Sequence, residues 1–137
     1  MRLSSCLPLA ALACIALAPA ARAATDQPVC AAADTVIYRV SELKPGGSLA
    51  GFAKAVADHI KWYADHGYTA DVFSWGQVVD YDQASHTGKL SPTRVFTLHQ
   101  HAAGVPHAQQ DAGWAAFVSE YDANSNMVSM QLLCTAH

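Results

Sequence analysis

The clearest structural signal in this 137-residue chain is the segment 35–67, TVIYRVSELKPGGSLAGFAKAVADHIKWYADHG. Its first nine residues, Thr35–Leu43, alternate β-branched and aromatic residues with polar ones, which predicts a half-buried strand. A Lys-Pro-Gly-Gly sequence then ends the strand, because proline lacks an N–H donor and paired glycines allow a sharp turn. From Leu49 the apolar residues recur at helical spacing up to Gly67, with Ser48 as the expected N-cap. The segment therefore predicts a strand followed by a helix.

The rest of the chain adds three more strand patterns and one more helix. Strand-like composition returns over 68–82, the polar stretch 83–93 indicates a loop, and 94–101 alternates again as a strand. Asp111 or a near neighbour is expected to cap a second helix, and the final run 127–134 is apolar enough on both faces for a strand covered on two sides. The apolar stripe of this second helix consists of Trp114, Phe117, Val118 and Tyr121.

The βαββαβ order predicts an α+β, ferredoxin-like sandwich over residues 35–137, preceded by a leader at 24–34. We expect right-handed crossovers and an antiparallel four-stranded sheet in the order 4-1-3-2, with both helices on one face. In that topology the first and last strands are antiparallel neighbours. Cys30 and Cys134 would then lie at the same edge, so we expect a disulfide between them.

The first 23 residues are typical of a secretory signal peptide. Arg2 supplies a positive charge, an apolar stretch follows, and the segment 21–23, Ala-Arg-Ala, offers a cleavage site. Cleavage there would remove Cys6 and Cys14 and leave the other two cysteines to pair in an oxidising compartment. We therefore expect an exported protein, either periplasmic or secreted.

Charge and length exclude several classes of partner. The chain holds eleven acidic residues against eight Lys and Arg, so it has no electrostatic footprint for nucleic acid or anionic lipid. The only long apolar segment is the predicted signal, which is too short to span a bilayer. We expect one domain, with no nucleic-acid partner and no membrane association after cleavage.

The element order, the length and the two-faced last strand resemble the dimeric α+β barrel superfamily, which includes antibiotic-biosynthesis-type monooxygenases and stress-induced barrel proteins. This resemblance implies a homodimer formed through the sheet face that the helices leave open. It carries over no catalytic residue, because no diagnostic motif accompanies it. The apolar residues of the last strand that favour such a partner are Met127, Val128, Met130, Leu132 and Leu133.

Seven histidines are the first candidates for chemistry. In the predicted topology His66, His101 and His107 lie at one end of the domain, where three imidazoles would suit zinc or copper. His99 is the fourth candidate ligand, since it shares a strand face with His101. The chain lacks a His-Glu-x-x-His or Cys-x-x-Cys motif, so we expect no metal and no cofactor as the default.

Whether these histidines can bind a metal depends on which face of the third predicted strand meets the helices. We expect Phe96 and Leu98 to point at the helices, which would turn His99 and His101 toward the dimer face. The histidines would then be partly buried or solvated side chains rather than ligands.

Aromatic residues suggest an apolar pocket between the sheet and the helices, although residues with this spacing are also typical of an ordinary core. Trp75 is the leading candidate, since the neighbouring Gly76 permits close approach of a ligand. The predicted pocket residues are Tyr38, Trp62, Trp75 and Trp114. Were the protein an enzyme, His59, His66 and Trp75 would be the residues placed beside its substrate.

Three functions fit these features. The first is a non-enzymatic binding or stress-related module that holds a small apolar ligand or a partner. The second is a cofactor-independent monooxygenase or isomerase that acts on a small aromatic substrate. The third is a histidine-based metal or haem binder. We favour the first, because the sequence contains no organised set of acid, base and nucleophile.

Overall fold

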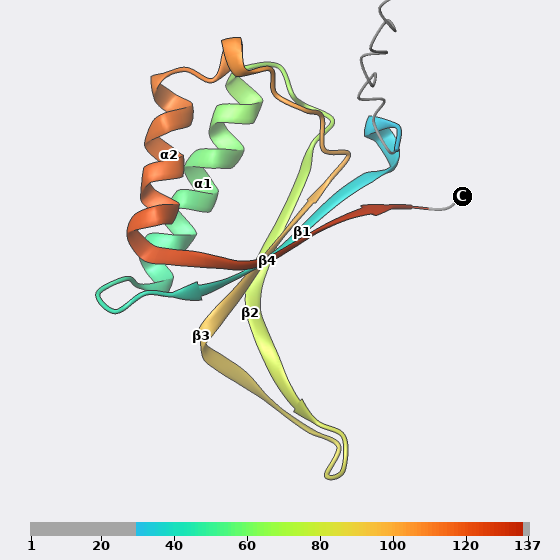
Figure 1. Ribbon diagram of the computed structural model, residues 1–137, viewed down its shortest axis with the longest axis vertical. Helices are drawn as coiled ribbons and strands as arrows, with labels where there is room; N and C mark the ends of the chain where they lie inside the picture. Colours follow the sequence, from blue (N-terminus) through green and yellow to red (C-terminus); the bar gives the residue numbers. More distant parts are fainter. Residues whose placement is uncertain (1–29, 136–137) are drawn as a thin grey trace, which may run out of the picture.

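The computed structural model describes residues 30–135. The predicted signal peptide at 1–23 and most of the leader lie outside the described residues. The predicted βαββαβ order is confirmed, with a short 3₁₀ helix before the first strand and another before the second helix (Figure 1). The elements are η1 (Ala32–Asp34), β1 (Thr35–Leu43), α1 (Leu49–Asp65), β2 (Val72–Asp82), β3 (Thr87–Gln100), η2 (His107–Gln109), α2 (Ala112–Asn124) and β4 (Ser125–Cys134).

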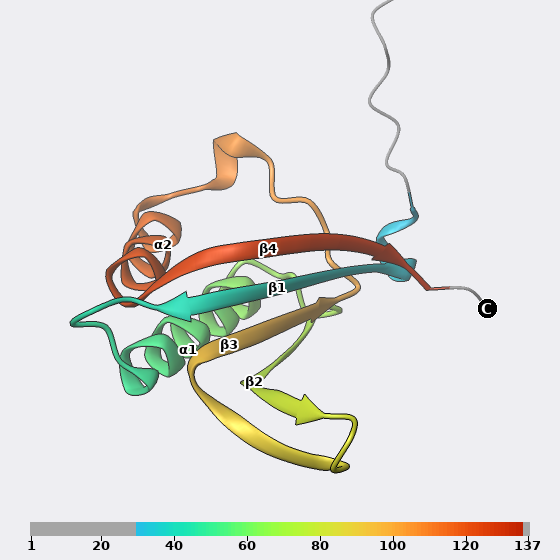
Figure 2. The ribbon, with the colours of Figure 1, turned by 60° about the horizontal axis from the view of Figure 1, so that its bottom comes forward.

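The four strands form one antiparallel sheet in the order β2-β3-β1-β4. This is the predicted order, and Figure 2 shows β1 running between β3 and β4. Each of the two inner strands is bonded along both edges, whereas β2 and β4 are the sheet edges. The two helices pack against each other and cover the same sheet face. The fold is therefore α+β with the ferredoxin-like arrangement.

Side-chain caps fix the start of both helices. The Ser48 hydroxyl accepts a hydrogen bond from the Gly51 N–H at 3.0 Å, and the Asp111 carboxylate accepts one from the Trp114 N–H at 2.9 Å. Each bond satisfies an amide that has no partner within the first helical turn. Gly67 follows α1 with a φ of 82°, a conformation that favours glycine.

Two buried clusters lie between the sheet and the helices. The first joins Phe52 and Val56 of α1 to Val95 of β3. The second joins α1 to α2 and consists of Trp62, Tyr63 and Phe117. Helix α1 thus supplies most of the core, while α2 buries only Phe117 and leaves space between itself and the sheet.

The prediction of a loop at 83–93 holds only for the turn at 83–86 and is wrong beyond it, because strand β3 already begins at Thr87. Together with the end of β2 it forms a hairpin arm that extends away from the helices (Figures 1 and 2). The pairing shifts register between Gln77 and Val79, opposite the segment that contains Pro92. Gln77 donates its side-chain amide to the Ser91 carbonyl at 3.1 Å across this bulge. The bulge accommodates the proline, whose missing N–H would break a regular ladder.

The expected facing of β3 is also wrong. Val95 packs on the α1 side, and Thr97 and His99 follow it on the same face. Phe96 and Leu98 therefore lie on the face that the helices leave open, where the Phe96 ring contacts Tyr38 at 6.2 Å between centroids. Both faces of β3 carry apolar residues, so the alternation alone could not show which one meets the helices.

A disulfide joins Cys30 to Cys134, with 5.7 Å between their Cα atoms, as predicted from the strand order. The register explains why they meet, because Thr35 at the start of β1 pairs directly with Cys134. Such a bond is compatible with an oxidising, exported compartment. In the part of the chain that the structure describes, no helix is long and apolar enough to cross a membrane.

Candidate functional site

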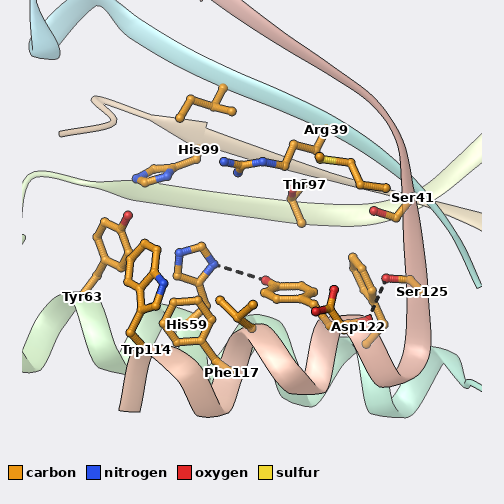
Figure 3. A pocket seen from close by; sticks show the side chains of 15 residues that line it. Arg39, Ser41, His59, Tyr63, Thr97, His99, Trp114, Phe117, Asp122 and Ser125 are labelled. Atoms are coloured by element: carbon orange, nitrogen blue, oxygen red, sulfur yellow. Dashed lines mark hydrogen bonds between the residues drawn. The ribbon is translucent and has the colours of Figure 1, made fainter. Parts of the chain in front are cut away.

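A cavity of about 260 Å³ lies between the covered face of the sheet and the two helices (Figure 3). The strands contribute mostly polar residues to its wall, and the helices contribute mostly aromatic ones. The exposed residues Val118 and Met127 place its mouth between α2 and β4. Its lining comprises Ile37, Arg39, Ser41, Phe52, His59, Tyr63, Thr97, His99, Trp114, Phe117, Val118, Tyr121, Asp122, Ser125 and Met127.

Among the described residues that line this wall, Arg39 is the only lysine or arginine. It lies in the middle of β1, paired with Thr97 on one side and Met130 on the other, and its side chain points into the cavity (Figure 3). Within residues 30–135 its guanidinium forms no ion pair and no hydrogen bond to a carboxylate. Burial lowers the pKa of Arg39, a sign that its charge is poorly solvated.

His59 faces Arg39 from α1, and its imidazole is almost fully buried. The ring stacks on Phe117 with centroids 4.5 Å apart, and its Nδ1 lies 3.3 Å from the Tyr121 hydroxyl. Its Nε2 is buried without a hydrogen-bond partner in the described residues. Burial, with the nearby charges of His99 and Arg39, lowers the pKa of His59 to about 3. The imidazole is therefore neutral at physiological pH.

The phenols that surround Arg39 are neutral too. Burial raises the pKa of Tyr63 to about 12, with Asp71 adding to the shift. Burial likewise raises the pKa of Tyr121 well above its ordinary value, although Arg39 opposes the shift. Neither phenol supplies a negative charge to balance the guanidinium at neutral pH.

His99 closes the cavity on the sheet side and is the most buried of its polar residues. Its ring stacks on Phe73 at 3.9 Å, and its Nε2 lies 3.5 Å from Asp71 Oδ1. Burial lowers the pKa of His99, although the Asp71 carboxylate acts in the opposite direction. Asp71 is thus directed at His99, and its other contact is a 3.2 Å bond from the Ala103 N–H.

The structure brings only some of the sequence candidates to this site. Trp114 and His59 line the cavity, whereas Trp62 lies in the adjacent core cluster. Trp75 packs beside Phe52 at 6.0 Å and is not part of the lining. Tyr38 was predicted to line the pocket, but it lies on the open face of the sheet. Its neighbours in β1, Ile37 and Arg39, occupy the covered face instead.

The candidate metal ligands are placed apart. His66 lies at the C-cap of α1, stacked on Trp62, with its Nε2 3.2 Å from Asp111 Oδ2. His101 follows β3 and places its Nδ1 2.6 Å from the Ala33 carbonyl, and His107 is exposed in η2. His99 faces the cavity, not the dimer face as expected. Within residues 30–135, no three His, Cys, Asp or Glu side chains are grouped so that they could hold a metal ion.

Sequence reasoning missed Arg39 and Tyr121 as site residues. An arginine in the middle of a strand is usually assigned to the solvent face, and a tyrosine in an apolar stripe is usually assigned to the core. One feature of the sequence could have indicated the position of Arg39. Arg39 shares its strand face with Ile37 and Ser41, and β1 is an inner strand of the predicted sheet, so one of its two faces had to be covered by the helices.

No protein-family model matches this chain, and no curated protein matches it either. The class of protein is therefore defined by the fold and the cavity alone. It is a disulfide-closed α+β protein with ferredoxin-like topology and an aromatic cavity that contains one unpaired arginine.

Proposed function

We propose that this chain is an exported, non-enzymatic binding module that holds a small ligand with an apolar body in the cavity between its sheet and helices. The single observation that carries the proposal is the cavity itself, with about 260 Å³ of space and aromatic walls. Binding sites for small molecules are typically concave, largely apolar and supplied with a few polar groups, and they commonly enclose about 300–1,000 Å³. A volume just below that range suits a molecule with one or two rings.

The polar groups of the cavity favour binding over acid–base catalysis. A general base works best when its pKa lies near the operating pH, and the pKa of His59 is lowered to about 3. Its buried and unpartnered Nε2 is the observation that favours the second candidate, a cofactor-independent monooxygenase or isomerase. So weak a base would abstract a proton poorly, whereas a neutral imidazole serves well as a hydrogen-bonding group for a ligand.

The partner that fits the open sheet face is a second copy of this chain, as in the dimeric α+β barrel proteins that the sequence resembles. On that face the middle of β1 and β3 carries apolar and aromatic side chains, and charged residues begin only at the Glu42–Arg94 pair. An apolar surface of this kind would suit a two-fold interface, in which the same patch of each copy meets. The residues that would meet at its centre are Tyr38, Val40, Phe96 and Leu98.

Calorimetric titration of the purified protein with one- and two-ring compounds, such as phenol, indole and benzoate, tests the binding function. We expect saturable binding of at least one compound, accompanied by a change in tryptophan fluorescence, since Trp114 lines the cavity. Val118→Trp should block the mouth and weaken binding, whereas Ala116→Trp, an exposed residue of the same helix outside the lining, should not.

Two results would overturn the proposal. One is the absence of saturable binding across the panel. The other is oxygen uptake or chemical conversion of a bound compound, which would favour the monooxygenase or isomerase instead.

A further inference from the structure

We infer that the ligand of this cavity carries one negative charge, a carboxylate attached to a small aromatic body, and that Arg39 binds this carboxylate. The inference rests on the proposed binding function and deepens it, since it names the chemical class that the cavity selects. It depends on two independent observations, an unpaired cation and an unpartnered buried imidazole nitrogen.

The first observation is that the positive charge of Arg39 forms no ion pair with any of the residues that the structure describes. The carboxylate of Asp71 is directed at His99, at 3.5 Å. Asp122 lies in the lining near the mouth but forms no ion pair with Arg39. The groups that face the guanidinium across the cavity are two phenols and the His59 imidazole, and all three are neutral at physiological pH.

An unpaired cation in such a setting favours an anionic ligand. Removing a charge from water is costly unless an opposite charge and hydrogen bonds replace the hydration. A guanidinium presents its N–H donors in a planar fork that matches the two oxygens of a carboxylate. A ligand carboxylate would therefore form charge-assisted bonds that no residue of the cavity wall supplies.

The second observation is the Nε2 atom of His59. This atom is buried without a partner, on a side chain that is only 9% exposed and lines the same cavity. Buried polar atoms are nearly always hydrogen-bonded, so an orphan in a cavity wall marks a place where a ligand atom can complete the set. It would contact a second polar group of the ligand, while the rings of Phe117 and Trp114 cover the aromatic body.

The test compares the affinity of the protein for an aromatic carboxylate with its affinity for the corresponding neutral amide, which has nearly the same shape. Benzoate and benzamide form one pair, and indole-3-acetate and indole-3-acetamide form the other. Titration calorimetry near neutral pH should show the acids binding about tenfold tighter or more, because a hydrogen bond to a charged group contributes more than a neutral one. Arg39→Met should abolish this preference by weakening the acids alone, and Arg39→Lys should retain part of it, since it keeps the charge but loses the fork.

Arg94→Met is the matched control. Arg94 is an exposed arginine of β3 that pairs with Asp80 of β2 and lies outside the cavity lining, so its loss removes the same net charge and should leave the preference intact. Circular dichroism and the affinity for the amides report whether each variant is folded. If Arg39→Met fails to fold, the wild-type comparison of acid with amide and the Arg39→Lys variant still test whether Arg39 binds a carboxylate.

The outcomes separate the two proposals. Equal affinity for acid and amide in the wild type, or a preference that survives Arg39→Met, would overturn the anionic ligand while leaving the binding function in place. Failure of all four compounds and of the neutral panel to bind would overturn the binding function, and the inference with it.

Discussion

The Nδ1 atom of His59 lies 3.3 Å from the hydroxyl of Tyr121, so one hydrogen bond joins the middle of α1 to the last turns of α2 at the wall of the cavity. The imidazole also stacks on Phe117, and its burial removes most of the hydration that a charged ring requires. The protein thus keeps His59 neutral by burial while the ring packs against Phe117. This arrangement makes the fold sensitive to acid.

We expect the His59→Gln variant to show a weaker pH dependence of the free energy of unfolding than the wild type. The pKa of His59 is lowered from 6.5 to about 3 in the folded state, so between these values the unfolded chain binds the extra proton. The stability that this neutral ring contributes is complete above the unfolded pKa and is lost as the pH falls toward 3. Urea unfolding from about pH 6 to about pH 4 should show the wild type losing up to about 1.4 kcal/mol per pH unit more than the variant.

The control for this experiment is His107→Gln, which changes an exposed histidine of η2. Its pH profile should follow that of the wild type. Parallel profiles for wild type and His59→Gln would contradict a neutral, buried imidazole.

Loss of the disulfide should be costly, because the bond closes a loop with a sequence separation of 104 residues. In the chain-entropy model a loop of about this length constrains the unfolded state by roughly 4 to 5 kcal/mol. We expect the double variant Cys30→Ser, Cys134→Ser to lose stability of that order in urea unfolding. Wild type in reductant should unfold at the midpoint of the variant, and a loss below about 1 kcal/mol would contradict the entropic account.

Gly47→Ala should destabilise the fold through a steric conflict. A Cβ atom at Gly47 would lie 2.2 Å from the carbonyl oxygen of Asn124, which also accepts a 3.0 Å hydrogen bond from the Lys44 N–H. The turn before α1 would have to move away from the end of α2, and overpacking of this kind typically costs about 1–3 kcal/mol. Gly104→Ala, where a Cβ meets open space, should be close to neutral in the same chemical-unfolding experiment. Equal stability of the two variants would refute the close contact.

Leu98→Asp should separate the proposed homodimer into monomers. Leu98 lies on the open face of β3, so a carboxylate there would be desolvated against the second copy, whereas in a monomer it meets water. Light scattering should report half the wild-type mass, with ligand binding retained. Ile60→Asp, which changes an exposed apolar residue of α1, should remain dimeric. A wild type that is monomeric at high concentration would remove the basis of this prediction.

The sequence was sufficient for the elements whose signals are local. Strand β1 spans the nine predicted residues, and the caps Ser48 and Asp111 start the helices where their side chains indicate. The strand order followed from topology, and the Cys30–Cys134 bond followed from the strand order. Each of these predictions needed only short-range sequence patterns or a general rule for how helices connect the strands of a sheet.

The features that were missed depend on contacts between distant segments. The hairpin arm forms because polar residues after Thr87 pair with β2, and nothing in their own composition indicates that partner. The facing of β3 depends on which apolar surface meets α1, so Phe96 and His99 were assigned to the wrong sides. The position of Arg39 in the cavity wall becomes evident only once both helices cover the strand that carries it.

The disulfide also determines how the domain carries mechanical load. Tension applied between a segment before Cys30 and a segment after Cys134 would pass through one covalent bond and bypass every strand and helix between them. Pulling on the two ends would therefore leave the cavity undistorted until that bond is reduced, after which the antiparallel pair β1–β4 would open from the Thr35–Cys134 end, one hydrogen-bonded pair at a time. In an oxidising compartment the cavity would be shielded from tension applied outside the two cysteines.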